Sequence, residues 1–181
     1  MKAKKTKAVV IRNRGYVCVA LYLSALCVAL FVFLSFLDSY AIASETVANS
    51  YYSGVEIALG VSGLTLNYLL LSCLIVGTVG GLLTLIVAII CSVSKKYSPL
   101  AAMLMALSIA ALTYAFIVSL LFPIVISDSL NQLSDPATLM ATTWPIYVMS
   151  GLLGLAMINN FGLLIYSSVD AYGLSNSIKA K

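Results

Sequence analysis

The sequence predicts an all-α integral membrane protein with four transmembrane helices, and three observations lead to that fold class. Hydrophobic residues make up 62% of the 181 residues, against about 45–50% in soluble domains. Charged residues make up only 9%, against about 25% in soluble domains. Four apolar stretches each exceed the roughly 20 helical residues that cross a bilayer. So much apolar surface with so few charges indicates a chain that faces lipid.

The charges predict the orientation of the chain in the membrane. All ten basic residues lie at 2–14, 95–96 and 179–181, whereas five of the six acids lie at 38–56 and 128–135. Basic residues collect on the cytoplasmic side of membrane proteins. Both termini and the 95–96 loop are therefore expected in the cytoplasm, with residues 1–15 as a basic tail and residues 16–181 as a single transmembrane domain.

The four spans follow in order at about 16–37, 64–93, 99–127 and 142–168. Helix is the expected state, because a lone strand in lipid leaves its backbone groups without hydrogen bonds. The first span is read as a retained helix and not as a signal peptide, since its apolar run of about 22 residues exceeds the usual 7–15. The loop at 94–98 is short, so the second and third spans are expected to be antiparallel neighbours. The expected layout is two tandem helical hairpins, each entering the membrane from the cytoplasm.

The two outer loops differ in character. The first, about 38–63, is too apolar for a flexible tether, and we expect a short interfacial helix followed by a hinge at 60–63. The second, about 128–141, is shorter and rich in turn residues. Near the end of the third span, Pro123 is expected to bend the helix and to free a carbonyl group.

Residues suited to catalysis or to metal binding are scarce. Histidine is absent, which removes the commonest general base and many transition-metal sites. The cysteines are dispersed within the spans without a C-x-x-C pair, and we read them as small apolar residues, with palmitoylation of Cys18 or Cys91 as an alternative. No ionisable side chain lies near the middle of a span, which argues against a proton-coupled transporter. We therefore expect no enzymatic activity, no cofactor and no metal.

The most polar intramembrane feature is the pair Asn159 and Asn160 in the fourth span. Adjacent helical residues point about 100° apart, so the two amides should face two different neighbours. Asn67, Tyr68 and Tyr114 are the candidate partners. The pair either joins helices by hydrogen bonds or lines a path for a neutral solute or a lipid headgroup.

Small residues recur at four-residue spacing on every span. Such ridges let helices approach closely where lipid provides no hydrophobic drive for association. Since a four-helix monomer does not obviously use all of them, we expect contacts beyond the monomer. The principal ridge residues are Gly77, Gly81, Ala102, Ala106, Ala110, Ser150 and Gly154, and the first span adds Ala20 with Ser24 and Ala25 with Ala29.

The basic tail is explained by topology and by attraction to anionic lipid, at about 1 kcal/mol per charge. We expect it to lie at the membrane surface and not to bind nucleic acid. Its basic residues are Lys2, Lys4, Lys5, Lys7, Arg12 and Arg14.

The order of spans is similar to that of claudins and tetraspanins, but those families rely on cysteines in the outer loops, and these loops contain none. The second hairpin resembles the helical-hairpin capsid proteins of spindle-shaped archaeal viruses. The resemblance rests on the segments 122–126, 136–138 and 144–146, with sequences FPIVI, PAT and WPI. It implies a self-assembling coat protein.

Three functions remain open on these grounds. We rank first a non-catalytic accessory subunit of a larger membrane complex, which acts by helix packing and outer-loop docking. A small channel or carrier for neutral solutes or lipids is second, and a self-assembling coat protein of a virus or vesicle is third. The expected partners are the lipid bilayer and other membrane subunits or copies of the chain itself.

Overall fold

The computed structural model describes residues 9–10, 14–43, 50–60, 66–94, 96–97, 99–124 and 139–179. Side chains are described for 14–39, 51–60, 66–94, 99–124 and 143–167. Five of the six basic residues of the tail (Lys2, Lys4, Lys5, Lys7 and Arg12) and residues 125–138 lie outside the described part of the chain.

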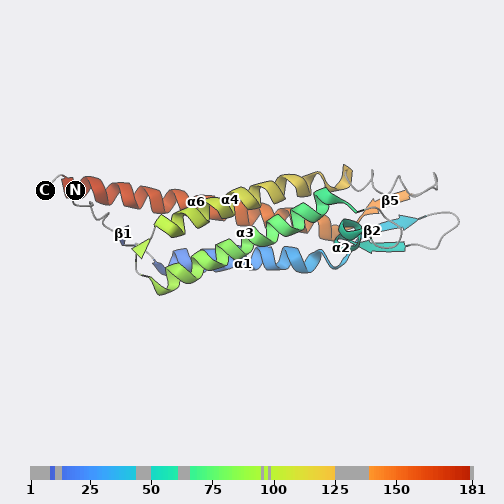
Figure 1. The fold of residues 1–181 in the computed structure, drawn as a ribbon, viewed down its shortest axis with the longest axis horizontal. Helices are drawn as coiled ribbons and strands as arrows, with labels where there is room; N and C mark the ends of the chain where they lie inside the picture. Colours follow the sequence, from blue (N-terminus) through green and yellow to red (C-terminus); the bar gives the residue numbers. More distant parts are fainter. Residues whose placement is uncertain are drawn as a thin grey trace.

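Four long helices run side by side and form an elongated bundle (Figure 1). Each contains a stretch long and apolar enough to cross a membrane. This confirms the four predicted spans, and by length and composition the chain is a multi-pass membrane protein. The helices are α1 (Arg14–Leu34), α3 (Tyr68–Val93), α4 (Pro99–Leu120) and α6 (Trp144–Lys179).

The helices contact one another in a closed ring. α1 packs against α3, α3 against α4, α4 against α6, and α6 against α1. Each helix therefore has two principal neighbours and leaves one side on the outside of the bundle.

Short strands at both ends were not expected from the sequence. At one end, here called the tail end, β1 (Val9–Val10) pairs antiparallel with β4 (Lys96–Tyr97). At the other, here called the sheet end, β2 (Asp38–Ala43) is the central strand between β3 (Ser50–Ser53) and β5 (Leu139–Thr142). The sheet joins the segments after α1 and before α6, and Figure 1 shows it beyond the helix ends.

The first outer loop does contain a short helix, α2 (Gly54–Leu59). The Ser53 hydroxyl accepts from the Glu56 N–H at 3.3 Å, and the Glu56 carboxylate accepts from the Ser53 N–H at 2.8 Å, which forms a capping box. Gly60 ends the helix with φ of 69°, a left-handed conformation that glycine adopts without strain. Ile57 and Ala58 are fully buried, so α2 packs onto the bundle.

The third span is shorter than predicted, and Pro123 explains where it ends. Proline has no N–H to bond the carbonyl four residues earlier, and α4 ends at Leu120 instead of near residue 127. The carbonyl so freed is that of Ser119, which accepts a hydrogen bond from the Ser150 hydroxyl of α6 at 3.3 Å. The freed carbonyl thus links α4 to α6.

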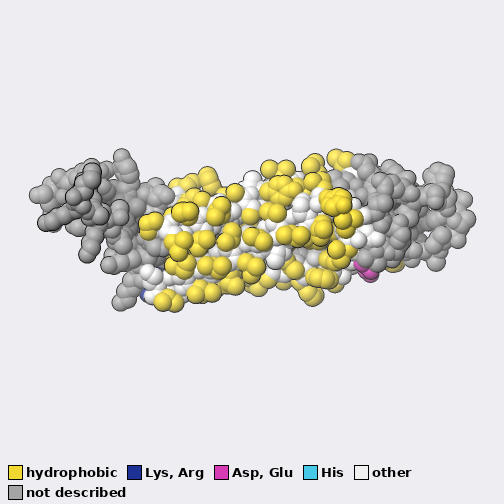
Figure 2. Space-filling view, viewed as in Figure 1, with side chains coloured by type: hydrophobic (Ala, Val, Ile, Leu, Met, Phe, Trp, Pro, Cys, Tyr) yellow, Lys and Arg dark blue, Asp and Glu magenta, His cyan; other side chains and the backbone are white. Residues whose placement is uncertain are grey.

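The ends of α1 and α6 also differ from the ends predicted from the sequence. α1 ends at Leu34 because residues 35–37 form a turn into β2. α6 continues to Lys179, 11 residues beyond the predicted end at 168. On the visible face, hydrophobic side chains cover the described middle of the molecule (Figure 2).

Candidate functional site

A layer of polar side chains lies inside the bundle, between two separate apolar cores. The core nearer the sheet end includes Val28, Phe31 and Leu112, and the core nearer the tail end includes Leu21 and Val87. Ser24, at the middle of α1, is ten residues from each end of that helix (24 − 14 and 34 − 24). The layer consists of Ser24, Thr84, Ser108, Asn159 and Asn160, and we call it the polar layer.

Asn159 connects α6 to α1. Its Nδ2 donates to the Ala20 carbonyl at 2.8 Å and to the Ser24 hydroxyl at 2.6 Å. Ser24 is buried. The small residues Ala20 and Ser24 therefore let α6 approach α1 closely enough for an amide to reach its backbone.

Asn160 connects α6 to the other two helices. Its Nδ2 donates to Thr84 Oγ1 at 2.8 Å and to Ser108 Oγ at 3.3 Å. All three side chains are fully buried, at 0% exposure. One amide pair thus bonds to every other helix of the bundle.

The directions of these bonds follow from what each group can donate. Because Asn160 donates to both hydroxyl oxygens, the hydroxyl protons of Thr84 and Ser108 are free to go elsewhere. Both hydroxyl oxygens lie within hydrogen-bonding distance of the Gly80 carbonyl, at 3.0 Å and 2.9 Å, and of each other, at 2.7 Å, so one hydroxyl donates to the other and the second donates to the carbonyl. The network therefore runs from Asn160 through the hydroxyls to a backbone acceptor on α3.

One atom of the layer stays unpaired in the structure. Asn160 Oδ1 is buried and accepts no hydrogen bond. A buried acceptor without a donor costs roughly 1–3 kcal/mol. The bonds made by Nδ2 and the packing around it must offset that cost.

The amides do face different neighbours, as their helical spacing predicts, but the residues suggested as partners lie elsewhere. Asn67 caps α3, with its Oδ1 accepting from the Leu70 N–H at 3.1 Å, and it stands 17 residues from Thr84, or about 25 Å along a helix. The Tyr114 hydroxyl pairs with the Ser72 hydroxyl at 2.7 Å on the exposed side. Tyr68 is 77% exposed.

The sequence alone does not predict a role for Thr84 or Ser108, and it predicts Ser24 only as a small residue of a packing ridge. Their signal was present: each is a hydroxyl near mid-span, at a depth that antiparallel neighbours share. Hydroxyls are common in transmembrane helices and often bond their own helix. Only the packing of the helices distinguishes Ser24, Thr84 and Ser108, which bond to an amide, from the other hydroxyl residues of the spans.

Most of the predicted small-residue ridges are used within the monomer. A Cβ at Gly77 would lie 3.1 Å from the Phe31 ring of α1, and one at Gly81 would lie 2.7 Å from Val28 Cβ. A Cβ at Gly154 would lie 2.9 Å from the Phe116 ring of α4. These three glycines therefore allow the close approach of α3 to α1 and of α6 to α4.

The ridge on α4 has a different position. Ala102 is half-buried, whereas Ala106 and Ala110 are exposed. They lie beside exposed Met103 and Leu107, which are 64% and 55% exposed. Ala106 and Ala110 therefore face outward from the bundle.

Arg14 makes a partly buried hydrogen bond to another helix, although the sequence predicted only a role at the membrane surface. Its Nε donates to the Cys91 carbonyl in the last turn of α3, at 2.9 Å. A cation at the carboxyl end of a helix is stabilised by unpaired carbonyls and by the helix dipole. Arg14 therefore fastens the start of α1 to the end of α3.

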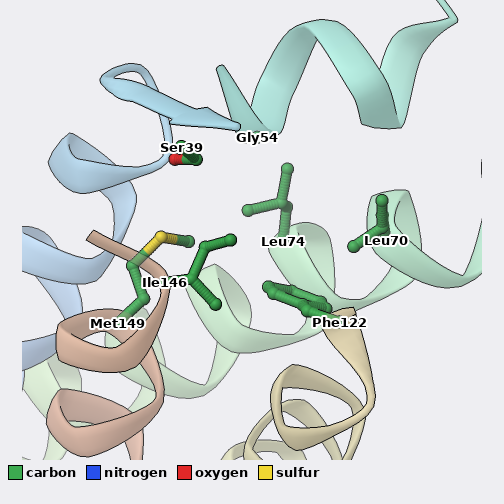
Figure 3. A pocket seen from close by; sticks show the side chains of 7 residues that line it. All are labelled: Ser39, Gly54, Leu70, Leu74, Phe122, Ile146 and Met149. Atoms are coloured by element: carbon green, nitrogen blue, oxygen red, sulfur yellow. The ribbon is translucent and has the colours of Figure 1, made fainter. Parts of the chain in front are cut away.

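Two hollows lie toward the sheet end. One is a cavity of about 10 Å³ (Figure 3), room for about one water molecule. Its lining is apolar apart from Ser39, whose hydroxyl donates to the Leu37 carbonyl at 2.9 Å. The cavity is lined by Ser39, Gly54, Leu70, Leu74, Phe122, Ile146 and Met149.

The second hollow is an open groove of about 310 Å³ between α4 and α6, flanked by Phe116, Pro123 and Gly151.

The chemistry available to the polar layer is hydrogen bonding, since amide and aliphatic hydroxyl side chains do not ionise near neutral pH. Within the described residues, no group of three or more His, Cys, Asp or Glu side chains could hold a metal ion. The cysteines are free thiols, and Cys73 donates to the Ala115 carbonyl at 3.3 Å. The geometry therefore suits cohesion between helices.

Comparison with known proteins adds no assignment: no protein-family model matches the chain, and no curated protein is significantly similar to it.

Proposed function

We propose that this chain is a non-catalytic structural subunit of a larger membrane complex, which acts by helix packing and by docking through its outer loops. The observation that carries the proposal is the outward-facing alanine ridge on α4. The glycines of the α3 and α6 ridges (Gly77, Gly81 and Gly154) face side chains of neighbouring helices inside the bundle. Ala106 and Ala110, in contrast, are exposed. Small residues on a lipid-facing surface are the usual contact between transmembrane helices.

The sheet end supports the docking part of the proposal. Both outer loops contribute strands to one sheet, so their described strands lie side by side. Tyr51 and Leu59, at 56% and 49% exposure, lie on this end. A surface held by backbone hydrogen bonds offers a partner a fixed shape.

The polar layer favours a structural role over the alternative of a channel or carrier. A solute path needs polar groups that can exchange partners, and the N–H groups of Asn160 and the hydroxyls of Thr84 and Ser108 already bond one another while fully buried. Transport through this layer would require the four helices that meet there to separate.

The first test enlarges the α4 ridge. Ala106→Phe should abolish association with the partner, because a large side chain prevents close helix approach, and it should leave the bundle folded because the residue is exposed. Native mass spectrometry of the protein extracted from its own membrane in a mild amphiphile measures the associated chains. Ile158→Phe, at a 64% exposed position on α6, is the matched control and should retain them.

A wild-type chain that runs alone in every mild amphiphile would overturn the proposed function. Loss of the partner in both variants would instead place the contact on a broader surface than the α4 ridge.

We further propose two tandem hairpins with both termini in the cytoplasm. The charge distribution supports this orientation, since all ten basic residues lie in the three segments assigned to that side. In a variant whose four native cysteines are alanine, a cysteine at Glu45 should react with an impermeant maleimide added to intact cells. A cysteine at Lys2 or Lys181 should react only after permeabilisation, and the reverse pattern would mean that the chain is inverted.

A further inference from the structure

Two of the free cysteines, Cys18 on α1 and Cys91 on α3, lie at the same depth in the bundle. Arg14, at the start of α1, bonds to the Cys91 carbonyl near the end of α3. Further along α1, Val28 faces Gly81, so the two helices run antiparallel. Cys18 precedes Val28 by ten residues (28 − 18), and Cys91 follows Gly81 by ten (91 − 81). Because every helical residue adds the same rise, the two cysteines are level with each other.

The packing of the side chains brings the two thiols together. Cys91 is a buried member of the core nearer the tail end, at 1% exposure. Cys18 is half-buried and packs against that same core. The two thiols are close enough to interact electrostatically. Cys18 and Cys91 therefore form a dithiol pair between two helices, and Cys18 is its more accessible member.

Hydrogen bonds on both sides of the pair fasten α1 to α3 at this level. Arg14, one helical turn before Cys18, donates from Nε to the Cys91 carbonyl at 2.9 Å. Tyr22, one turn after Cys18, pairs its hydroxyl with the Ser92 hydroxyl at 3.2 Å. Redox-active cysteines typically have a cation beside them, and Arg14 supplies one. The pair therefore lies in a fixed part of the α1–α3 contact, next to a positive charge.

We propose that Cys18 and Cys91 are a site of reversible oxidation, at which hydrogen peroxide joins α1 to α3 through a disulfide. The Cys18 sulfur attacks one peroxide oxygen, the O–O bond breaks, and the other oxygen leaves as water with the thiol proton. The product is a sulfenic acid at Cys18. The Cys91 sulfur then attacks the Cys18 sulfur, so that the S–S bond forms and the S–O bond breaks. The hydroxyl group leaves with the Cys91 proton as a second water.

The balance of the reaction is two electrons and two protons, which pass from the two thiols to one peroxide. An external dithiol reverses the reaction by thiol–disulfide exchange and is itself oxidised. Peroxide suits this site because it is small and uncharged, and the pair lies between apolar helices. The disulfide adds a covalent link to the hydrogen bonds that already fasten α1 to α3. Oxidation thus locks the tail end of the bundle without involving the ridge on α4.

The experiment follows the thiols of the pair in the full chain, reconstituted in phosphatidylcholine vesicles. Cys27→Ala with Cys73→Ala leaves only Cys18 and Cys91. After exposure to hydrogen peroxide the protein is unfolded in sodium dodecyl sulfate, and its free thiols are counted with a maleimide that carries a polymer. We expect both thiols to disappear together within single chains and dithiothreitol to restore both. Peptide mass spectrometry of the oxidised wild-type chain should find the same Cys18–Cys91 bond.

The remaining cysteines supply the matched control on the same two helices. Cys18→Ala with Cys91→Ala leaves Cys27 on α1 and Cys73 on α3. The position on α3 level with Cys27 is 82 (81 + 28 − 27), nine residues from Cys73 (82 − 73) and about 13 Å along the helix. A disulfide requires Cα atoms within about 7 Å. This variant should therefore form no intramolecular disulfide.

A single-cysteine protein shows whether peroxide reaches the site. With Cys91 also replaced by alanine, Cys18 should form a sulfenic acid that dimedone traps. If Cys18 is trapped in that protein but stays a free thiol beside Cys91, the proposal is overturned. A disulfide that forms only between chains, or a Cys18 that peroxide oxidises in neither protein, would overturn it as well.

Discussion

At the scale of single residues, Asn160 shows how a buried amide depends on its partners, because its burial is tolerated only where those partners satisfy its hydrogen bonds. Its N–H groups find Thr84 and Ser108, whereas its Oδ1 finds no donor. Replacement by an apolar residue of similar size therefore removes both favourable bonds and an unfavourable group. The cost of Asn160→Leu should be small, below about 2 kcal/mol.

A double-mutant cycle isolates the bond itself. Asn160→Leu combined with Thr84→Val should give a coupling energy of about 0.6 kcal/mol and at most about 1.7 kcal/mol, as for other interhelical hydrogen bonds in membranes. Unfolding in mixed micelles with increasing sodium dodecyl sulfate measures the four variants of the cycle. Asn159→Leu with Thr84→Val is the control and should show no coupling, because Asn159 bonds to α1.

At the scale of the helices, glycine positions set how closely the elements approach. The α1–α3 contact is tightest where Gly81 faces Val28. Gly81→Ala should destabilise the protein by about 1–3 kcal/mol, since the added methyl group overlaps a side chain that is itself buried. The same micelle titration measures the effect.

Two further variants test the cause of that loss. Gly151→Ala is the control, because an added Cβ there meets no atom within 4 Å, and it should be neutral or stabilising through helix propensity. Val28→Ala combined with Gly81→Ala should cost less than the sum of the two single changes. A simple sum would mean that the overlap is not the reason for the loss.

At the scale of the whole molecule, the sheet joins parts of the chain that are far apart in sequence. Ala41 in β2 is partnered with Ala141 in β5, 100 residues later (141 − 41). Cysteines at both positions, in the cysteine-free variant, should therefore form an intramolecular disulfide that changes the electrophoretic mobility of the unreduced protein. Partnered Cα atoms in a sheet fall within the range that a disulfide spans.

Register provides the control for this cross-link. Ala41→Cys with Leu139→Cys is two residues out of register, since Leu139 is partnered with Ala43. It should cross-link much more slowly. Equal rates for the two pairs would mean that the strands do not hold this alignment.

The number of spans and their approximate positions could be predicted because they depend on local properties. Apolar length and the absence of charge are readable residue by residue, and each predicted span corresponds to a helix of the bundle. Pro123 was likewise predicted to free a carbonyl group, and α4 ends where that carbonyl lies. The exact helix ends were less accurate, because turns and strands at residues 35–43 compete with helix.

The sequence by itself thus determined a four-span, apolar, mostly helical chain with two amides that must find partners in different directions. Only the tertiary structure decided that those partners are Ser24, Thr84 and Ser108, that the α3 ridge faces inward while the α4 ridge faces outward, and that Arg14 binds α3. The physical reason is that hydrophobicity acts on each residue separately, whereas hydrogen bonds and close packing depend on which distant residues meet. That pairing is fixed by how the four helices fit together, and composition does not specify it.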